Sequence, residues 1–357
     1  MQRNKDYKLI DLIKFLCAYL VIGIHTRPLQ AVSVLLDKVV YYNISNYSGQ
    51  EFIVLDDPIS SFDSVYKNKI AFCIIKFLEN KKQIILTHNT DLIRLLNVQM
   101  KDSFNLYILN NVDGGRNGFL PVKRDEKNIL ISLSDLVNLF QNKNGKLASI
   151  IHDKRLFLMA MIPFLRGYIH IMNDPEDLYG QLSRLMHGFE NGSLDIADIY
   201  KKTFGYEVEP TEVISVSDIL NVPISGLDII DAEEYPLLAD TLIQTLIYYH
   251  IRMKVEYELV SIFNIPHPEG QVLLLTDIIQ KAFRSAAGAT QEQKEKLRNH
   301  RVFFTSRKTL LNEFNHFEGN MNIFQPAIDI TETALQKEVA DIENELIQLR
   351  AEYATVH

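Results

Sequence analysis

FIVLDDPISSFDSVYKNKIAFCIIKFLENKKQIILTHN, residues 52–89, is the stretch that decides the fold. Two short apolar runs, 52–55 and 84–86, are separated by a spacer of helical length, and each run ends in polar side chains. Such a strand–helix–strand pattern predicts a βαβ unit with two parallel strands, the first of them buried on both faces. Carboxyl ends of parallel strands share one sheet edge, where open α/β sheets bind ligands, so we expect acid and imidazole to meet there.

The polar residues at these strand ends have the composition of a phosphoryl-transfer site. Asp56 and Asp57 follow the first run, and His88 follows the second. In phosphoryl-transfer ATPases one carboxylate holds the Mg²⁺ shell, and another group orients or deprotonates the attacking water. The spacing therefore favours one carboxylate on a metal, one on a nucleophile and an imidazole near a γ-phosphate.

The segments DDPISSFD and ILTHN resemble the Walker B motif, D-loop and H-loop of ABC-type ATPases. They are most similar to the SMC-like, AAA-domain ATPases of bacterial defence and anticodon-nuclease systems. The resemblance implies an ABC-type P-loop NTPase lobe of the α/β class that uses ATP and Mg²⁺. It assigns Asp56 to the metal, Asp57 and His88 to catalysis, and Ser61 and Asp63 to the cofactor-binding D-loop.

Two motifs of that family are missing from the sequence. There is no GxxxxGK[ST] loop to cradle phosphates and no LSxGQ signature. Ser48-Gly49-Gln50 imitates part of the signature, but it lies too close to Asp56 for a helix to intervene. We therefore expect a truncated, ATPase-related protein whose nucleotide site depends on a homodimer or on a P-loop-bearing partner chain.

The N-terminal segment points to a different protein family. Residues 8–29, KLIDLIKFLCAYLVIGIHTRPL, resemble the first transmembrane helix of the acyltransferase 3 family, and His25 would match that family's proposed catalytic histidine. The family needs several such helices, and this chain has no other long uncharged run. An amphipathic or buried helix is the alternative, with membrane contact only through residues 9–24. We expect the chain to be the C-terminal half of an ATPase joined to this segment.

Composition sets broad limits on the class of protein. The 357 residues are 47% hydrophobic and 23% charged, with a formal net charge of −8, as in globular proteins. Cys17 and Cys73 form no CxxC or Cys/His ligand spacing, so neither a disulfide framework nor a zinc site is expected. These features favour a cytoplasmic protein, with membrane association only through the N-terminal helix.

The rest of the pattern divides the chain into four parts. Turn residues between two strand-like runs predict a hairpin at 104–122, and polar residues 141–146 suggest a domain boundary. Helical periodicity dominates afterwards, and a heptad-like spacing from Leu335 to Tyr353 predicts either a short coiled coil or a docked helix. The expected parts are an N-terminal apolar helix at 1–30, a partial ATPase lobe at 31–148, a mainly α-helical domain at 149–330 and an amphipathic helix at 331–357.

A basic cluster in the second half leaves a further question open. It suggests either nucleic-acid contact or an ordinary solvated helix face. The other functional alternatives are a non-catalytic helical interaction module and a membrane acyltransferase remnant. The cluster consists of Lys294, Lys296, Arg298, His300, Arg301, Arg307 and Lys308.

Overall fold

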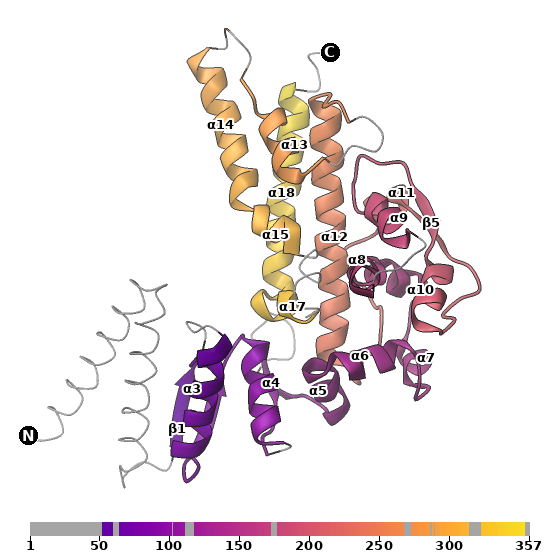
Figure 1. Cartoon of the computed structure of the whole chain (residues 1–357). Helices are drawn as coiled ribbons and strands as arrows, with labels where there is room; N and C mark the ends of the chain where they lie inside the picture. The colour runs from indigo at the N-terminus through magenta and orange to yellow at the C-terminus, as the bar shows by residue number, and fades with distance from the viewer. Residues whose placement is uncertain are drawn as a thin grey trace, which may run out of the picture. The chain divides into compact units, whose positions relative to one another are not determined.

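The computed structural model describes residues 52–59, 64–101, 103–110, 118–172, 177–267, 273–285, 288, 290–313 and 323–353. The chain is mixed α/β and mostly helical, with a small parallel sheet. It divides into two compact units, one ending at Leu106 and the other beginning at Tyr107 (Figure 1). The expected part at 1–30 and the first residues, 31–51, of the expected ATPase lobe at 31–148 lie outside the described residues.

Unit 1 contains the predicted βαβ arrangement. Strand β1 (Phe52–Asp56) leads through helix α3 (Ser64–Phe77) to strand β2 (Lys82–Leu86), and helix α4 (Thr90–Gln99) follows. The two strands pair in parallel, with Val54 opposite Ile84 and Asp56 opposite Leu86. The prediction of two parallel strands around a helix is therefore confirmed.

The prediction that the first strand is buried on both faces is wrong. Successive side chains of a strand point to opposite faces of the sheet, and only Ile53 of β1 is fully buried. Ile53 belongs to a core shared with α3 and α4, which includes Ile70, Ile74 and Leu92. Phe52 and Val54 on the other face are 51% and 55% exposed, because no described element covers that face.

Unit 2 begins with the predicted hairpin. Strands β3 (Tyr107–Asn110) and β4 (Gly118–Pro121) pair antiparallel, and the rings of Tyr107 and Phe119 lie edge to face across the pair. The hairpin thus belongs to the second unit, and the border between the units precedes the boundary expected near residue 148.

Three short helices follow the hairpin: α5 (Arg124–Ile131), α6 (Leu133–Phe140) and α7 (Lys146–Ile150). Ser132 caps α6 by accepting a hydrogen bond from the Asp135 N–H. Before α7 the chain turns through Gly145, whose φ of +68° is a conformation that glycine adopts without steric cost.

Helix α12 (Pro236–Ile262) is the centre of unit 2. Its 27 residues are apolar around most of the circumference, which is typical of a helix enclosed by others. It packs against α8 (Lys154–Met172), α11 (Val216–Leu220) and α18 (Glu332–Tyr353), and Figure 1 shows α12 and α18 running side by side.

A second layer of small elements covers α8. It comprises α9 (Leu178–Leu185), β5 (Ser193–Asp195), α10 (Ile196–Phe204) and β6 (Val213–Ser215), with β5 and β6 paired antiparallel. Helix α10 begins at Ile196 because the Asp195 carboxylate accepts the Asp198 N–H as a cap. Aromatic side chains from α6, α8 and α10 fill the space between these helices: Phe140, Phe157, Phe164, Tyr200 and Phe204.

The C-terminal helices complete unit 2. They are α13 (Leu275–Ala282), α14 (Gln291–Ser306), α15 (Lys308–Asn312), α17 (Gln325–Asp329) and α18. The heptad-spaced residues of α18 are buried within the chain, so this segment is a docked helix here. Ion pairs from Lys254 to Glu343 and from Arg350 to Glu258 join α18 to α12.

Helix α8 bears on the question of a membrane. Among the described residues it is the helix with the length and apolar composition of a membrane span, with a mean hydropathy of 1.2. However, 61% of the 18-residue apolar stretch of α8 is buried inside the protein. Core helices of soluble proteins have the same properties, so α8 is weak evidence for a span. The apolar segment at residues 9–24 lies outside the described residues.

Candidate functional site

The carboxyl edge of the β1–β2 pair is where the predicted acid and imidazole meet. Asp57 follows β1 immediately, and its N–H donates to the Leu86 carbonyl of β2 at 2.7 Å. Its backbone has a φ of +42°, in the left-handed region that few non-glycine residues adopt. The backbone therefore leaves the extended path at Asp57 while it remains bonded to the neighbouring strand.

Two side chains from the turn after β2 contact the Asp57 carboxylate. The Thr87 hydroxyl donates to Asp57 Oδ1 at 2.9 Å, and His88 Nδ1 lies 3.3 Å from Asp57 Oδ2. Both carboxylate oxygens are thus engaged by residues thirty positions along the chain. Asp57 is partly buried, whereas the imidazole of His88 is 59% exposed.

The turn that carries Thr87 and His88 is itself held in place. The Thr87 oxygen accepts the Asn89 N–H at 3.0 Å, and the Asn89 side chain caps α4 by accepting the Asp91 N–H at 2.9 Å. Asp91 also pairs with Lys67 of α3 at 2.9 Å. The hydroxyl that holds Asp57 is therefore fixed by the start of α4, which limits the positions open to the carboxylate.

Asp56, the predicted metal acid, lies apart from this network. It is the last residue of β1 and it is exposed, whereas the backbone leaves the extended path at Asp57. The structure therefore brings Asp57 and His88 together, but it does not join Asp56 to them. Ser61 and Asp63, the predicted D-loop residues, lie outside the described residues.

The arrangement has clear chemical capacities. A carboxylate with a fixed orientation can orient or deprotonate a water molecule, and an exposed imidazole beside it can hydrogen-bond to a phosphoryl oxygen. Carboxylate and hydroxyl oxygens are also the donors that Mg²⁺ prefers. Within the described part of the chain, however, no three His, Cys, Asp or Glu side chains are grouped closely enough to hold a metal alone.

A buried charged cluster in unit 2 was not foreseen from the sequence. Arg252 Nε donates to Glu256 Oε1 at 2.6 Å within α12, and His187 Nδ1 lies 3.3 Å from Glu256 Oε2. The Gly188 N–H donates to the same Oε2 at 3.2 Å. The sequence signal for this cluster is the Arg–Glu spacing of four on the mainly apolar helix α12.

Electrostatics keeps the buried Glu256 carboxylate ionised. Burial raises the pKa of Glu256, but the Arg252 charge and the His187 hydrogen bond outweigh burial and hold the pKa below its usual value. The guanidinium of Arg252 also bonds to Asn312 and to the Leu311 carbonyl, so its charge is neutralised and its donors are used. With its groups bonded to one another and to the backbone, this cluster ties α12 to α15 and to the segment after α9.

Comparison of the chain with protein-family models, with curated proteins and with solved structures finds no match. The ATPase hypothesis consequently depends on the motifs of residues 52–89 and on the geometry at the end of β1 and β2.

Proposed function

We propose that unit 1 carries the acid-and-histidine half of a nucleotide-hydrolysing site, with the phosphate-binding half supplied by a partner chain. The observation that supports this most directly is the contact of both Asp57 oxygens with Thr87 and His88 at one sheet edge. A strand-end carboxylate held by the next strand's hydroxyl and imidazole suits ATP hydrolysis better than a structural cap, because His88 remains exposed.

In this proposal each side chain has a stated role. Asp57 orients the attacking water or accepts a proton from it, and Thr87 fixes the direction of the Asp57 carboxylate. His88 contacts the γ-phosphate from the exposed side. Mg²⁺, when bound, would neutralise phosphate charge, and Asp56 at the end of β1 is the side chain proposed to hold it.

The proposal of a partner is based on a motif that these 357 residues lack. None of the 357 residues forms a GxxxxGK[ST] loop, and phosphoryl transfer depends on backbone N–H groups and a lysine around the β- and γ-phosphates. Those groups must come from elsewhere. A homodimer of these 357 residues would lack them too, so the proposed partner is a different, P-loop-bearing chain.

The test is Mn²⁺–ATP binding followed by NMR on histidine-labelled protein, because a half-site binds weakly and paramagnetic broadening detects weak binding. We expect Mn²⁺–ATP to broaden the His88 ring resonances, and Asp57→Asn to abolish most of the effect. Asp91→Asn is the matched control, because it removes the same charge three residues from His88. Equal broadening in wild type and Asp57→Asn, or none in wild type, would contradict the proposed site.

The proposal that a partner chain is needed for hydrolysis has its own test. The purified chain should release phosphate from Mg²⁺–ATP at the background rate. Turnover by the chain alone that disappears in Asp57→Asn would show that the site needs no partner, while leaving the role of Asp57 intact.

The alternative of a non-catalytic interaction module loses one of its supports. It relied partly on the terminal heptads, but Leu335, Val339, Ile342, Leu346 and Leu349 are buried within unit 2. The acyltransferase alternative concerns residues 1–30 alone, which lie outside the described residues.

A further inference from the structure

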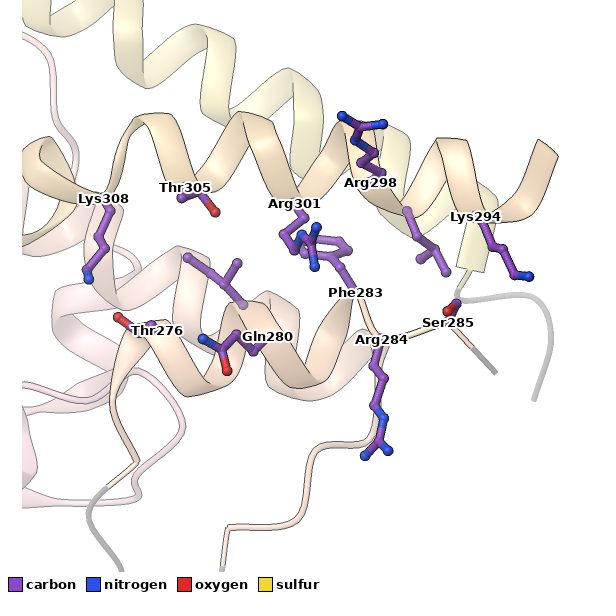
Figure 2. Close-up of a pocket in the computed structure, with 12 residues that line it drawn as sticks. Thr276, Gln280, Phe283, Arg284, Ser285, Lys294, Arg298, Arg301, Thr305 and Lys308 are labelled. Carbon is purple, nitrogen blue, oxygen red and sulfur yellow. The ribbon is translucent and has the colours of Figure 1, made fainter. Parts of the chain in front are cut away.

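A basic cleft lies between α13 and α14 in unit 2, far along the chain from the acid and histidine of unit 1. Its volume is about 680 Å³, within the range of ligand-binding clefts. Figure 2 shows Lys308 near one end, Arg301 between the two helices and Lys294 near the other end. Arg284 and Arg298 complete the five cations of its lining, and the lining includes no carboxylate.

The cations of this region fall into two groups that differ in their partners. Arg307 pairs with Glu338 at 2.9 Å, His300 with Glu345 at 2.6 Å and Lys296 with Glu292 at 3.7 Å. By contrast, no ion pair joins any of the five lining cations to a carboxylate in the part of the chain that the structure describes. The acids of α18 thus bond to Arg307 and His300, whereas they form no ion pair with the five cations that line the cleft.

This distribution opposes the charge of the whole protein. The chain carries a formal net charge of −8, whereas residues 284–308 contain seven Lys or Arg against two Glu. These five cations are exposed, and like charges gathered around one cleft create a positive potential that attracts a negative ligand.

The shape of the cleft indicates the kind of anion. From Lys294 to Thr305 the lining follows α14 for eleven residues, which is about 16 Å at 1.5 Å per residue. That length exceeds a single phosphate group and suits a chain of phosphates. Arg284 follows the end of α13 and its side chain points away from α14, whereas the other four cations come from α14 and α15, so the positive charge lies mainly along the α14 side of the cleft (Figure 2).

We propose that the α13–α14 cleft binds the phosphate backbone of single-stranded nucleic acid. A single strand can enter the cleft, whereas a duplex would rest across its rim and contact fewer cations. Phe283 lies in the floor, but its ring is buried and stacked on Phe304 at 5.7 Å, so it is not available for base stacking. Recognition is therefore mainly electrostatic and independent of base sequence.

The test is fluorescence anisotropy with a labelled 12-nucleotide oligo(U), titrated with the full chain between 50 and 200 mM salt. Arg298→Glu combined with Arg301→Glu is expected to weaken binding at least tenfold. It should also reduce the slope of log K against log salt by about 1.4, because each phosphate contact on a single strand contributes about 0.7. The milder pair Arg298→Gln and Arg301→Gln checks the result if charge reversal affects folding.

The matched control reverses two charges that flank the cleft without lining it. Lys281 lies on α13 and Lys296 on α14, both are exposed, and Lys281→Glu with Lys296→Glu changes the net charge by the same amount. This control should weaken binding less than threefold. An equal loss in both double variants would show only general surface attraction and would overturn the proposal.

Two competitors test the choice of ligand. A duplex of the same length is expected to bind more weakly than the single strand. Pyrophosphate at 1 mM should displace little of the bound oligo(U). A duplex that binds as tightly, or complete displacement by pyrophosphate, would overturn the assignment to a single strand. Asp57→Asn should bind oligo(U) like wild type, because this inference does not depend on the nucleotide site.

Discussion

At the scale of single residues, Gly188 is the position where the fold tolerates no side chain. A Cβ built at Gly188 would lie 1.9 Å from the Met253 carbonyl oxygen, a backbone atom of α12 that cannot move aside. The Gly188 N–H also holds the buried Glu256. The chain after α9 can therefore approach α12 only with glycine at this position.

We expect Gly188→Ala to lower the free energy of unfolding by about 1–3 kcal/mol or more, the usual cost of overpacking. Urea denaturation followed by circular dichroism measures the loss. Gly192→Ala is the control, because a Cβ there would meet only a Leu185 methyl group at 3.7 Å, an ordinary contact. Equal effects at the two glycines would contradict the steric explanation.

The buried Arg252–Glu256 pair gives a pH-dependent prediction. In the wild type the pKa of Glu256 is depressed, so its contribution to stability is present above the unfolded-state pKa and is lost as pH falls through the folded-state value. Arg252→Met removes the main compensating charge, and burial then raises the pKa of Glu256 above its unfolded value.

Arg252→Met should therefore cost about 3–5 kcal/mol at pH 7–8, as for a buried charge that has lost its partner. The difference from wild type should shrink as pH falls toward 4.5, where the carboxyl becomes protonated in the variant. Urea titrations at several pH values measure this. Lys254→Met, which removes a more exposed pair with Glu343, should cost about 1 kcal/mol or less. A cost independent of pH would be inconsistent with the buried-charge explanation.

Among the elements, α12 begins against a second buried acid. Glu126 of α5 accepts the Leu238 N–H at 3.0 Å in the first turn of α12, while its other oxygen, Oε2, has no hydrogen-bond partner within the described part of the chain. Burial raises the pKa of Glu126 to about 7, although the hydrogen bonds from Leu238 and Leu237 oppose that rise. The carboxyl group that contacts the first turn of α12 therefore has a pKa near neutral pH.

The sign of this effect is opposite to that of Glu256. Between pH 4.5 and 7 the unfolded chain loses the Glu126 proton and the folded chain keeps it, so stability falls as pH rises, by up to about 3 kcal/mol. Glu126→Gln keeps an acceptor for Leu238 and cannot ionise. The stability of this variant should match that of wild type at pH 5 and exceed it at pH 8. Glu234→Gln on the surface should show no such change in relative stability with pH. Thermal denaturation across this range decides the point.

Helix α18 offers a direct comparison of its two faces. Ile342 is fully buried against the rest of unit 2, whereas Ile347 is 65% exposed on the same helix. Ile342→Ala should cost about 2–5 kcal/mol, the range for large-to-small core substitutions, and Ile347→Ala less than about 0.5 kcal/mol. If Ile347→Ala were the costlier change, α18 would pack through the face that carries Ile347. Guanidinium denaturation of the two variants separates the cases.

At the scale of the whole molecule, α8 tests whether unit 2 is organised around a buried helix. Leu158 is fully buried and Ile171 is 51% exposed. Leu158→Asp should cost more than about 4 kcal/mol, since an unpaired charge would enter the core, and Ile171→Asp should be nearly neutral in water. A helix that faced lipid would suffer from both changes, so detergent-dependent instability of Ile171→Asp would contradict a core role.

The sequence predicts some of the site and fold well because the relevant signals are local. Two apolar runs separated by a helical spacer specify parallel strands, and parallel strands bring their carboxyl ends together, so the meeting of Asp57 and His88 follows from topology. The Ser132 cap and the buried seam of α18 are similarly local. In contrast, the exposed face of β1 could not be foreseen, because burial depends on how many layers cover a sheet.

By itself, the sequence determined the βαβ unit, the hairpin, the helical character of the second half and the basic composition of residues 284–308. Only the tertiary structure decided which cations remain without a carboxylate partner, because the acids that neutralise Arg307 and His300 come from α18, more than thirty residues away. It also decided the burial of the Arg252–Glu256–His187 cluster. Charge pairing and burial depend on contacts between distant segments, and periodicity within one segment carries no information about them.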